Sequence, residues 1–193
     1  MIRIAEFKEM NVVMNDVMND VITYVYSLYK AHESLVQTNG FFSLNLTKAS
    51  VIKIMDLLDF GHDQKESCLW IGCGDAREVL CMAMLYPNVH FTAVDINESA
   101  IHVAQAKFEL IGLKNINIEY KDALLISEGK YTHIYSTALA GVELYDHIVQ
   151  LCPKTLCMLS SMWKHSNSSY SVEKKAQVSL SGSRERKTLI CRS

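Results

Sequence analysis

Apolar residues in the first third of the chain recur at the spacing of a helix. A valine or a tyrosine stands at every fourth position from Val13 to Tyr29, which predicts an amphipathic helix within residues 4–33. A second helix is expected to begin after an N-cap at Thr47 and to end at Leu58. Two helices are therefore expected in the first third of the chain.

After residue 66 the pattern changes to short apolar runs separated by longer amphipathic stretches. The runs predict strands and the stretches predict helices, because a strand needs few residues and a helix needs about ten or more. Strands are expected at residues 67–71, 89–94, 116–120, 131–135 and 155–161, and helices at residues 76–86, 99–111 and 142–151. Strands that alternate with helices of this length form βαβ units, so the sheet is expected to be parallel.

The last two apolar runs, residues 176–181 and 187–191, are joined by a polar segment that contains glycine. Such a pattern is typical of an antiparallel hairpin. The predicted fold class is α/β, with a doubly wound, mainly parallel sheet, a closing antiparallel hairpin at the C-terminus and a helical segment at the N-terminus. We interpret residues 1–66 as a helical extension packed on a core of residues 67–193, together one structural domain.

Composition supports a globular protein. The 193 residues are 49% hydrophobic and 21% charged, which fits one domain and excludes a disordered chain. The formal net charge of −2 is not that of a dedicated nucleic-acid binder. Neither a secretory leader nor a membrane span is expected, because charged residues follow Met1 and because Asn and Asp residues interrupt the apolar stretch from Val12 to Tyr29.

The pattern of cysteines indicates the redox environment of the protein. None of the six forms a C-x-x-C pair, and most stand in apolar runs. We expect reduced core thiols in an intracellular, cytoplasmic protein, and neither a disulfide nor a metal site.

Glycine and aspartate gather at the predicted carboxyl ends of three strands. Gly72-Cys73-Gly74 follows the first strand, where glycines permit a tight turn and let a ligand approach bare backbone. Asp95 ends the second strand, 23 residues after Gly72, and can accept hydrogen bonds from ribose hydroxyls. Asp122 follows the third strand and can accept one from the amine of adenine. Each feature alone is weak, but the three in this order predict a nucleoside site.

Two common nucleotide sites do not fit. A dinucleotide fingerprint has a third glycine three residues after the second, and Arg77 occupies that position. A phosphate-binding P-loop ends in Gly-Lys-Ser or Gly-Lys-Thr, which the sequence lacks. The short glycine turn therefore suits a nucleoside ligand without phosphate.

Residues 67–161 resemble the nucleotide-binding core of class I, Rossmann-like methyltransferases, which use S-adenosyl-L-methionine (SAM). The resemblance is carried by three segments, Leu69–Ala76, Phe91–Asn97 and Tyr120–Ala123. It implies that SAM is the cofactor and that a methyl group passes to an acceptor, which the sequence leaves open among protein, RNA and small molecule. A narrower similarity is to Dot1-type lysine methyltransferases.

The resemblance assigns the cofactor site to seven residues at the three strand ends, namely Gly72, Cys73, Gly74, Asp95, Ile96, Asp122 and Ala123. The glycine loop would lie under the methionine part of SAM, and Asp95 would hold the ribose. Ile96 would pack on the adenine, and Asp122 would accept from the adenine amine beside the backbone N–H of Ala123. No catalytic residue is implied, because displacement at a sulfonium needs alignment more than acid–base groups.

One position departs from the family pattern. The family usually carries Asp or Glu two residues before the first glycine, and this sequence has Trp70 there. A second hypothesis follows, in which the chain keeps the fold as a non-catalytic binding or scaffold protein. The segment Tyr135–Leu139, which faces the methyl group in this family, lacks the Asn/Asp-Pro-Pro-Tyr motif of amino-group methyltransferases of nucleic acids.

The C-terminal segment is basic. Between residues 174 and 192 it holds six basic residues and one acid, which are Lys174, Lys175, Arg184, Arg186, Lys187, Arg192 and Glu185. Such a segment can attract a nucleic acid or another acidic surface. The alternative is that these side chains protect an edge strand from aggregation.

Overall fold

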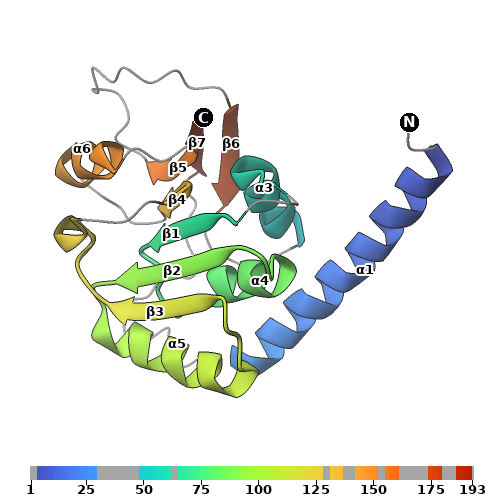
Figure 1. The fold of residues 1–193 in the computed structure, drawn as a ribbon, viewed down its shortest axis with the longest axis horizontal. Coiled ribbons are helices and arrows are strands. Elements are labelled where there is room, and N and C mark those ends of the chain that lie inside the picture. Colours follow the sequence, from blue (N-terminus) through green and yellow to red (C-terminus); the bar gives the residue numbers. More distant parts are fainter. Residues whose placement is uncertain are drawn as a thin grey trace.

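The computed structural model describes residues 4–29, 48–61, 65–127, 131–136, 142–151, 155–160, 174–179 and 186–192. A seven-stranded sheet forms its centre, with helices on both faces (Figure 1). The strands are β1 (Ser67–Ile71), β2 (His90–Asp95), β3 (Ile116–Tyr120), β4 (His133–Ser136), β5 (Thr155–Ser160), β6 (Lys174–Ser179) and β7 (Arg186–Arg192). The helices are α1 (Ile4–Tyr29), α3 (Lys48–Leu58), α4 (Arg77–Leu85), α5 (Glu98–Ile111) and α6 (Val142–Gln150), with a 3₁₀ turn η2 (Ala123–Leu125).

The strands lie in the order β3-β2-β1-β4-β5-β7-β6. Strands β1 to β5 pair in parallel, which confirms the predicted parallel sheet. Strand β7 runs antiparallel to both β5 and β6. The chain builds outward from β1 to β3 and then returns to place β4 on the other side of β1. Ligands of such sheets bind at the carboxyl ends of the strands near this reversal.

Strand β1 is buried on both faces, which explains why its sequence is a continuous apolar run. Cys68 and Trp70 join one apolar layer, together with residues of α3, α4 and α5. Leu69 and Ile71 join the other layer, which includes Ile148 of α6. The loop that follows β1 therefore begins from a strand that is held from both sides.

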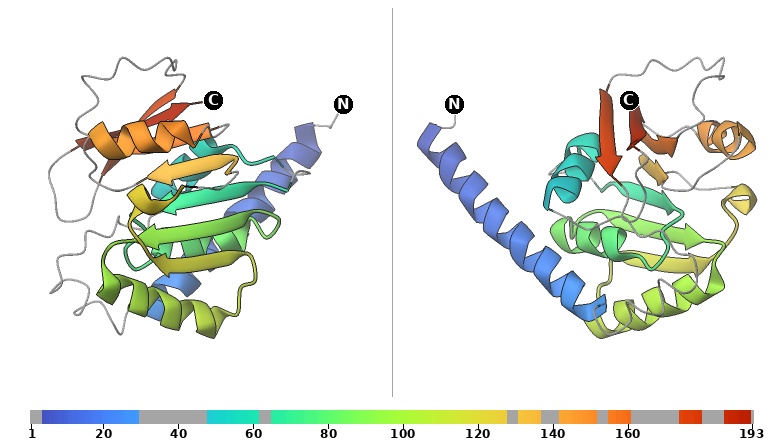
Figure 2. Two further views of the ribbon diagram at one scale, coloured as in Figure 1. Left: turned by 60° about the vertical axis from the view of Figure 1, so that its left-hand side comes forward. Right: turned by 180° about the vertical axis from the view of Figure 1, so that it is seen from behind.

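Helix α1 packs on α4 through its C-terminal half and projects away from the other elements at its N-terminal half (Figure 1; Figure 2). Val21, Val25 and Tyr29 are buried, as the four-residue spacing predicted. Val17 is 46% exposed, however, and Met18 is buried in its place. Four-residue steps drift by about 40° each around a helix, so the earlier valine has rotated off the packed face.

Other expectations have mixed outcomes. Helix α5 ends as predicted at Gly112, which has a φ of 69° and donates its N–H to Phe108. Thr47 and residues 30–33 lie outside the described residues, and the domain division at residue 66 stays a prediction. In the described ranges, no helix combines the length and the apolar character that crossing a membrane requires.

Candidate functional site

The loop after β1 is a tight turn bonded to the neighbouring strand. Gly72 and Gly74 have φ angles of 74° and 55°, a region that favours glycine. The N–H groups of Gly72 and Cys73 both donate to the carbonyl oxygen of Val94 in β2, at 2.9 and 3.1 Å. A Cβ added at Gly74 would meet no atom within 4 Å, so this glycine faces open space. The loop therefore leaves bare backbone open to a ligand.

Asp95 joins this loop to the end of β2. Its Oδ2 accepts a hydrogen bond of 2.7 Å from the N–H of Gly74, and its Oδ1 accepts one of 2.9 Å from the N–H of Asn97. The side chain of Asn97 in turn accepts from Ala100 and caps α5. Each carboxylate oxygen has a second acceptor position. Asp95 can thus hold the loop and still accept from ligand hydroxyls.

The ends of β2 and β3 present an exposed apolar side chain beside an exposed acid. Ile96, directly after β2, is 70% exposed. Asp122, directly after β3, is also exposed, and its Oδ1 accepts a hydrogen bond of 3.0 Å from Leu124. Ala123 is buried at the start of η2. Since β2 and β3 pair in parallel, these residues lie at the same end of the sheet as the glycine loop.

Trp70, which stands where the resemblance implies an acid, is a core residue. It is 1% exposed and pairs in register with Tyr135 of β4, with ring centroids 4.1 Å apart. The indole belongs to the core on the α4 face of the sheet. Strand β1 therefore offers no carboxylate at the loop.

A cluster of buried charges lies behind the loop and was not predicted from the sequence. The Arg77 Nε donates to Asp75 Oδ2 at 2.8 Å, and the guanidinium lies 4.9 Å from the ring centre of Tyr29. The hydroxyl of Tyr29 donates to the backbone carbonyl of Asp75. Burial raises the pKa of Asp75, and Arg77 opposes the rise. The only signal in the sequence is a charged Asp-Ala-Arg-Glu segment beside the glycine loop, which is typical of a solvated helix start.

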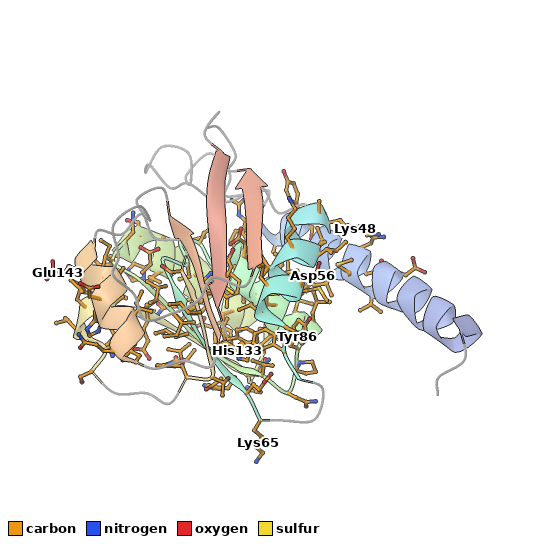
Figure 3. The ribbon with its side chains drawn as sticks, turned by 90° about the horizontal axis from the view of Figure 1, so that it is seen from above. Lys48, Asp56, Lys65, Tyr86, His133 and Glu143 are labelled. Carbon is orange, nitrogen blue, oxygen red and sulfur yellow. The ribbon has the colours of Figure 1, made fainter. Side chains whose placement is uncertain are left out.

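A second group of polar side chains, with His133 buried and Tyr86 half-buried, lies toward the amino ends of the strands. Tyr86 and His133 contact the ring of Phe60, at centroid distances of 4.9 and 4.7 Å. Figure 3 shows both residues near α3 and far from Glu143 of α6. His133 also shares a hydrogen bond of 2.9 Å with the hydroxyl of Thr132. These contacts make His133 a core residue at the end of the sheet opposite the glycine loop.

Part of the predicted site lies outside the described residues, namely residues 137–139, which were expected to face the methyl group. The described strand β4 ends at Ser136, whose buried hydroxyl oxygen has no hydrogen-bond partner within the described part of the chain. The structure brings Gly72, Cys73, Gly74 and Asp95 together, with Ile96, Asp122 and Ala123 at the adjoining strand ends.

In this parallel sheet the strand order reverses beside the glycine loop, and acids follow at the next two strand ends. This arrangement is typical of Rossmann-like proteins that bind a nucleoside. A family model described as a methyltransferase domain matches residues 62–175, more than half of the chain. The chain therefore belongs to the family of methyltransferase domains. It is 32% identical over 98 residues to the uncharacterized protein RP789 of Rickettsia prowazekii, a match that covers 48% of this chain and 18% of that protein.

Several solved methyltransferase structures share the fold. TrmN from Thermus thermophilus has a TM-score of 0.60 at 16% identity, covering 73% of this chain and 47% of that one. Precorrin-6y C5,15-methyltransferase from Geobacter metallireducens has a TM-score of 0.61 at 14% identity, and the match covers 79% of this chain and 93% of that one. Magnesium protoporphyrin IX methyltransferase from Synechocystis, solved with bound SAM, has a TM-score of 0.59 at 15% identity. That match covers 90% of this chain and 97% of the other. The chain spans less than half the length of RP789 and of TrmN, and the similarity to Dot1-type enzymes stays a prediction.

Proposed function

We propose that this chain binds SAM at the glycine loop and at the ends of β2 and β3, and that it transfers the methyl group to an acceptor. The observation that carries the proposal is the 2.7 Å hydrogen bond from Gly74 to Asp95. It joins the loop and the acid, which are 21 residues apart, into one site. Membership of the methyltransferase domain family supports the same activity.

The residues present fit this cofactor. Gly74 faces open space, so the methionine part can lie against bare backbone. Asp95 retains acceptor positions for the two ribose hydroxyls. Ile96, 70% exposed, offers an apolar surface to the adenine ring, and Asp122 offers an acceptor to its amine. The short loop matches a ligand that has no phosphate.

The chain's own residues act by holding and aligning. When bound, SAM supplies a methyl group on a positively charged sulfonium. The loop and Asp95 fix the position of the ligand, and correct alignment is the main requirement of a direct displacement. Ser136 ends β4 beside Ile71 and would border the acceptor side of the site.

The proposal predicts saturable binding that depends on Asp95. Calorimetry should detect binding of SAM and of its demethylated product, S-adenosylhomocysteine. The substitution Asp95→Ala should weaken both by about 1–3 kcal/mol, since ligand donors and the Gly74 N–H lose their acceptor. Glu98→Gln is the matched control, because Glu98 is a nearby exposed acid that lies 3.9 Å from the exposed ring of His102. Wild-type protein that binds neither ligand would refute the proposal.

A scaffold or binding role without catalysis is the second candidate. The observation that favours it is Trp70, whose indole is buried in the core where the family carries an acid. The two candidates differ in turnover. Incubation of the protein with cell fractions and SAM labelled in its methyl group would leave more label on an acceptor than the fractions alone only if the chain is an enzyme. Transfer by wild type that Asp95→Ala abolishes would exclude the scaffold role.

A further inference from the structure

A buried carboxyl oxygen without a partner in the described residues lies in the first turn of the helix that follows the glycine loop. Glu78 is the second residue of α4, which begins directly after the loop, and it is 8% exposed. Its Oε1 has no hydrogen-bond partner within the described part of the chain. Buried polar atoms are normally paired, so an unpaired carboxyl oxygen beside a ligand loop points to a functional role.

The groups around Glu78 make it a neutral acid in the free protein. Burial, and after it the carboxylate of Asp75, raise the pKa of Glu78 to about 8. Tyr135 of β4 and Cys81 of α4 lie close enough to be affected by this acid: burial raises the pKa of both, and an ionised Glu78 raises it further. The cation next in sequence, Arg77, is engaged by Asp75 and by the ring of Tyr29.

Tyr135 marks where this acid lies relative to the sheet. Its hydroxyl is also buried without a partner in the described residues, and its ring lies against that of Trp70, tilted by 40°. Tyr135, Trp70 and α4 residues belong to the same apolar layer, and Glu78 acts electrostatically on Tyr135, so Glu78 lies near the α4 face of the sheet. Trp70, next to last in β1, offers no carboxyl there.

We propose that Glu78 receives the positive charge of the ligand: it is protonated in the free protein and releases its proton when a cation binds over the Gly72–Gly74 loop. The O–H bond of the carboxyl breaks, its electron pair stays on the carboxylate oxygen, and the proton passes to the buffer. The inference rests on the proposed function, because it takes the sulfonium and ammonium groups of SAM as the cation.

The direction of the pH effect follows. A nearby positive charge favours the ionised carboxyl and so lowers the pKa of Glu78 in the complex. Binding is then weaker where the free acid is protonated, and affinity rises with pH up to about 8, by at most tenfold per pH unit. Above that pH the free acid is already ionised and the rise ends.

Calorimetry in two buffers of different ionisation enthalpy tests the proposal by counting protons. At pH 7, wild type should release up to about 0.9 proton more per SAM than Glu78→Gln, the protonated fraction of an acid with a pKa about 8. The amino group of the free ligand titrates equally in both experiments, so the comparison is made at one pH and with one ligand. The control Glu66→Gln, at the opposite end of β1 and also buried, should match wild type.

The possible outcomes separate this inference from the proposed function. Binding with equal proton counts in wild type and Glu78→Gln, or with proton uptake, would overturn the inference and leave the proposed function standing. Absence of binding by wild type would overturn both. Should Glu78→Gln fail to fold, carbon NMR of wild type with labelled glutamate carboxyls decides: one carboxyl should titrate near pH 8, and ligand should move it lower. No such carboxyl, or no change with ligand, would refute the inference.

Discussion

Gly74 meets two requirements at one position. Its φ of 55° favours glycine, and the space where a Cβ would stand is open. Gly112 shares both properties, with a φ of 69° and nothing within 4 Å of an added Cβ, but it lies at the end of α5. Substitutions at the two glycines can therefore distinguish the effect of backbone strain from the effect of ligand contact.

Alanine at either glycine should lower the free energy of unfolding by about 1–2 kcal/mol, the cost of a left-handed alanine. Only Gly74→Ala should also weaken SAM binding, by about tenfold or more, because its methyl group enters the space proposed for the ligand. Denaturant unfolding and calorimetry on the two variants measure the two effects. Equal ligand affinity in both variants would place the ligand away from Gly74.

At the residue scale, the sequence predicted that the glycine loop and Asp95 lie at neighbouring strand ends, which the structure shows; their contact with SAM stays a prediction. Glycines at one strand end, followed by an acid at the next, are what a nucleoside ligand requires of a parallel sheet. Glu78 and Arg77 could not be recognised, because charged residues at a helix start are usually solvated. The packing of α4 against α1 and against the sheet buries this segment, and these contacts join residues far apart in sequence.

At the element scale, α1 and the glycine loop are joined by Tyr29. Its hydroxyl donates to the Asp75 carbonyl, and its ring lies against Arg77 and, at 5.9 Å, Lys107 of α5. The last turn of α1 thus fixes the loop from behind. Helix α1 is therefore a part of the site's support and not merely a covering of the core.

Tyr29→Phe should preserve the packing and remove the hydroxyl. It should lower the free energy of unfolding by about 1–3 kcal/mol, since the buried Asp75 carbonyl loses its donor. We also expect several-fold weaker SAM binding, because the loop is held less firmly. Tyr26→Phe, on an exposed position of the same helix, is the control. Unchanged ligand affinity in Tyr29→Phe would show that α1 does not support the loop.

Strand and helix positions were largely predictable because each core element is apolar and is bounded by glycine, proline or aspartate. Strand β3 matches its expected bounds, and β2 begins and ends one residue later than expected. The predicted packed face of α1 was wrong at Val17, because a four-residue repeat is longer than a helical turn. The packing of α1 on α4 shows at which turn the four-residue series leaves the buried face.

At the scale of the whole molecule, the order of the strands is the feature that local patterns do not contain. The parallel sheet follows from the alternation of strands and helices. The position of β4 beside β1, however, depends on contacts between residues far apart in the sequence. This position of β4 creates the reversal beside the glycine loop. The site therefore depends on topology as much as on its own residues.

The pair β6 and β7 continues the sheet beyond β5, and β6 is its edge strand. The basic residues of this segment support two proposals: attraction of a nucleic acid or acidic surface, and protection of the edge. Reversing the charges of Arg184, Arg186 and Lys187 distinguishes them. Attraction predicts binding of RNA or DNA at low salt, which falls steeply as salt rises and is lost in the reversed variant. Edge protection predicts no such binding and more aggregation of the variant.

A crystal structure of the protein with S-adenosylhomocysteine tests the proposed cofactor site most directly. We expect the ligand's methionine part over Gly72–Gly74, its ribose hydroxyls within hydrogen-bond distance of the Asp95 carboxylate, and its adenine between Ile96 and Asp122. A ligand bound elsewhere, or bound here without contact to Asp95, would contradict this assignment.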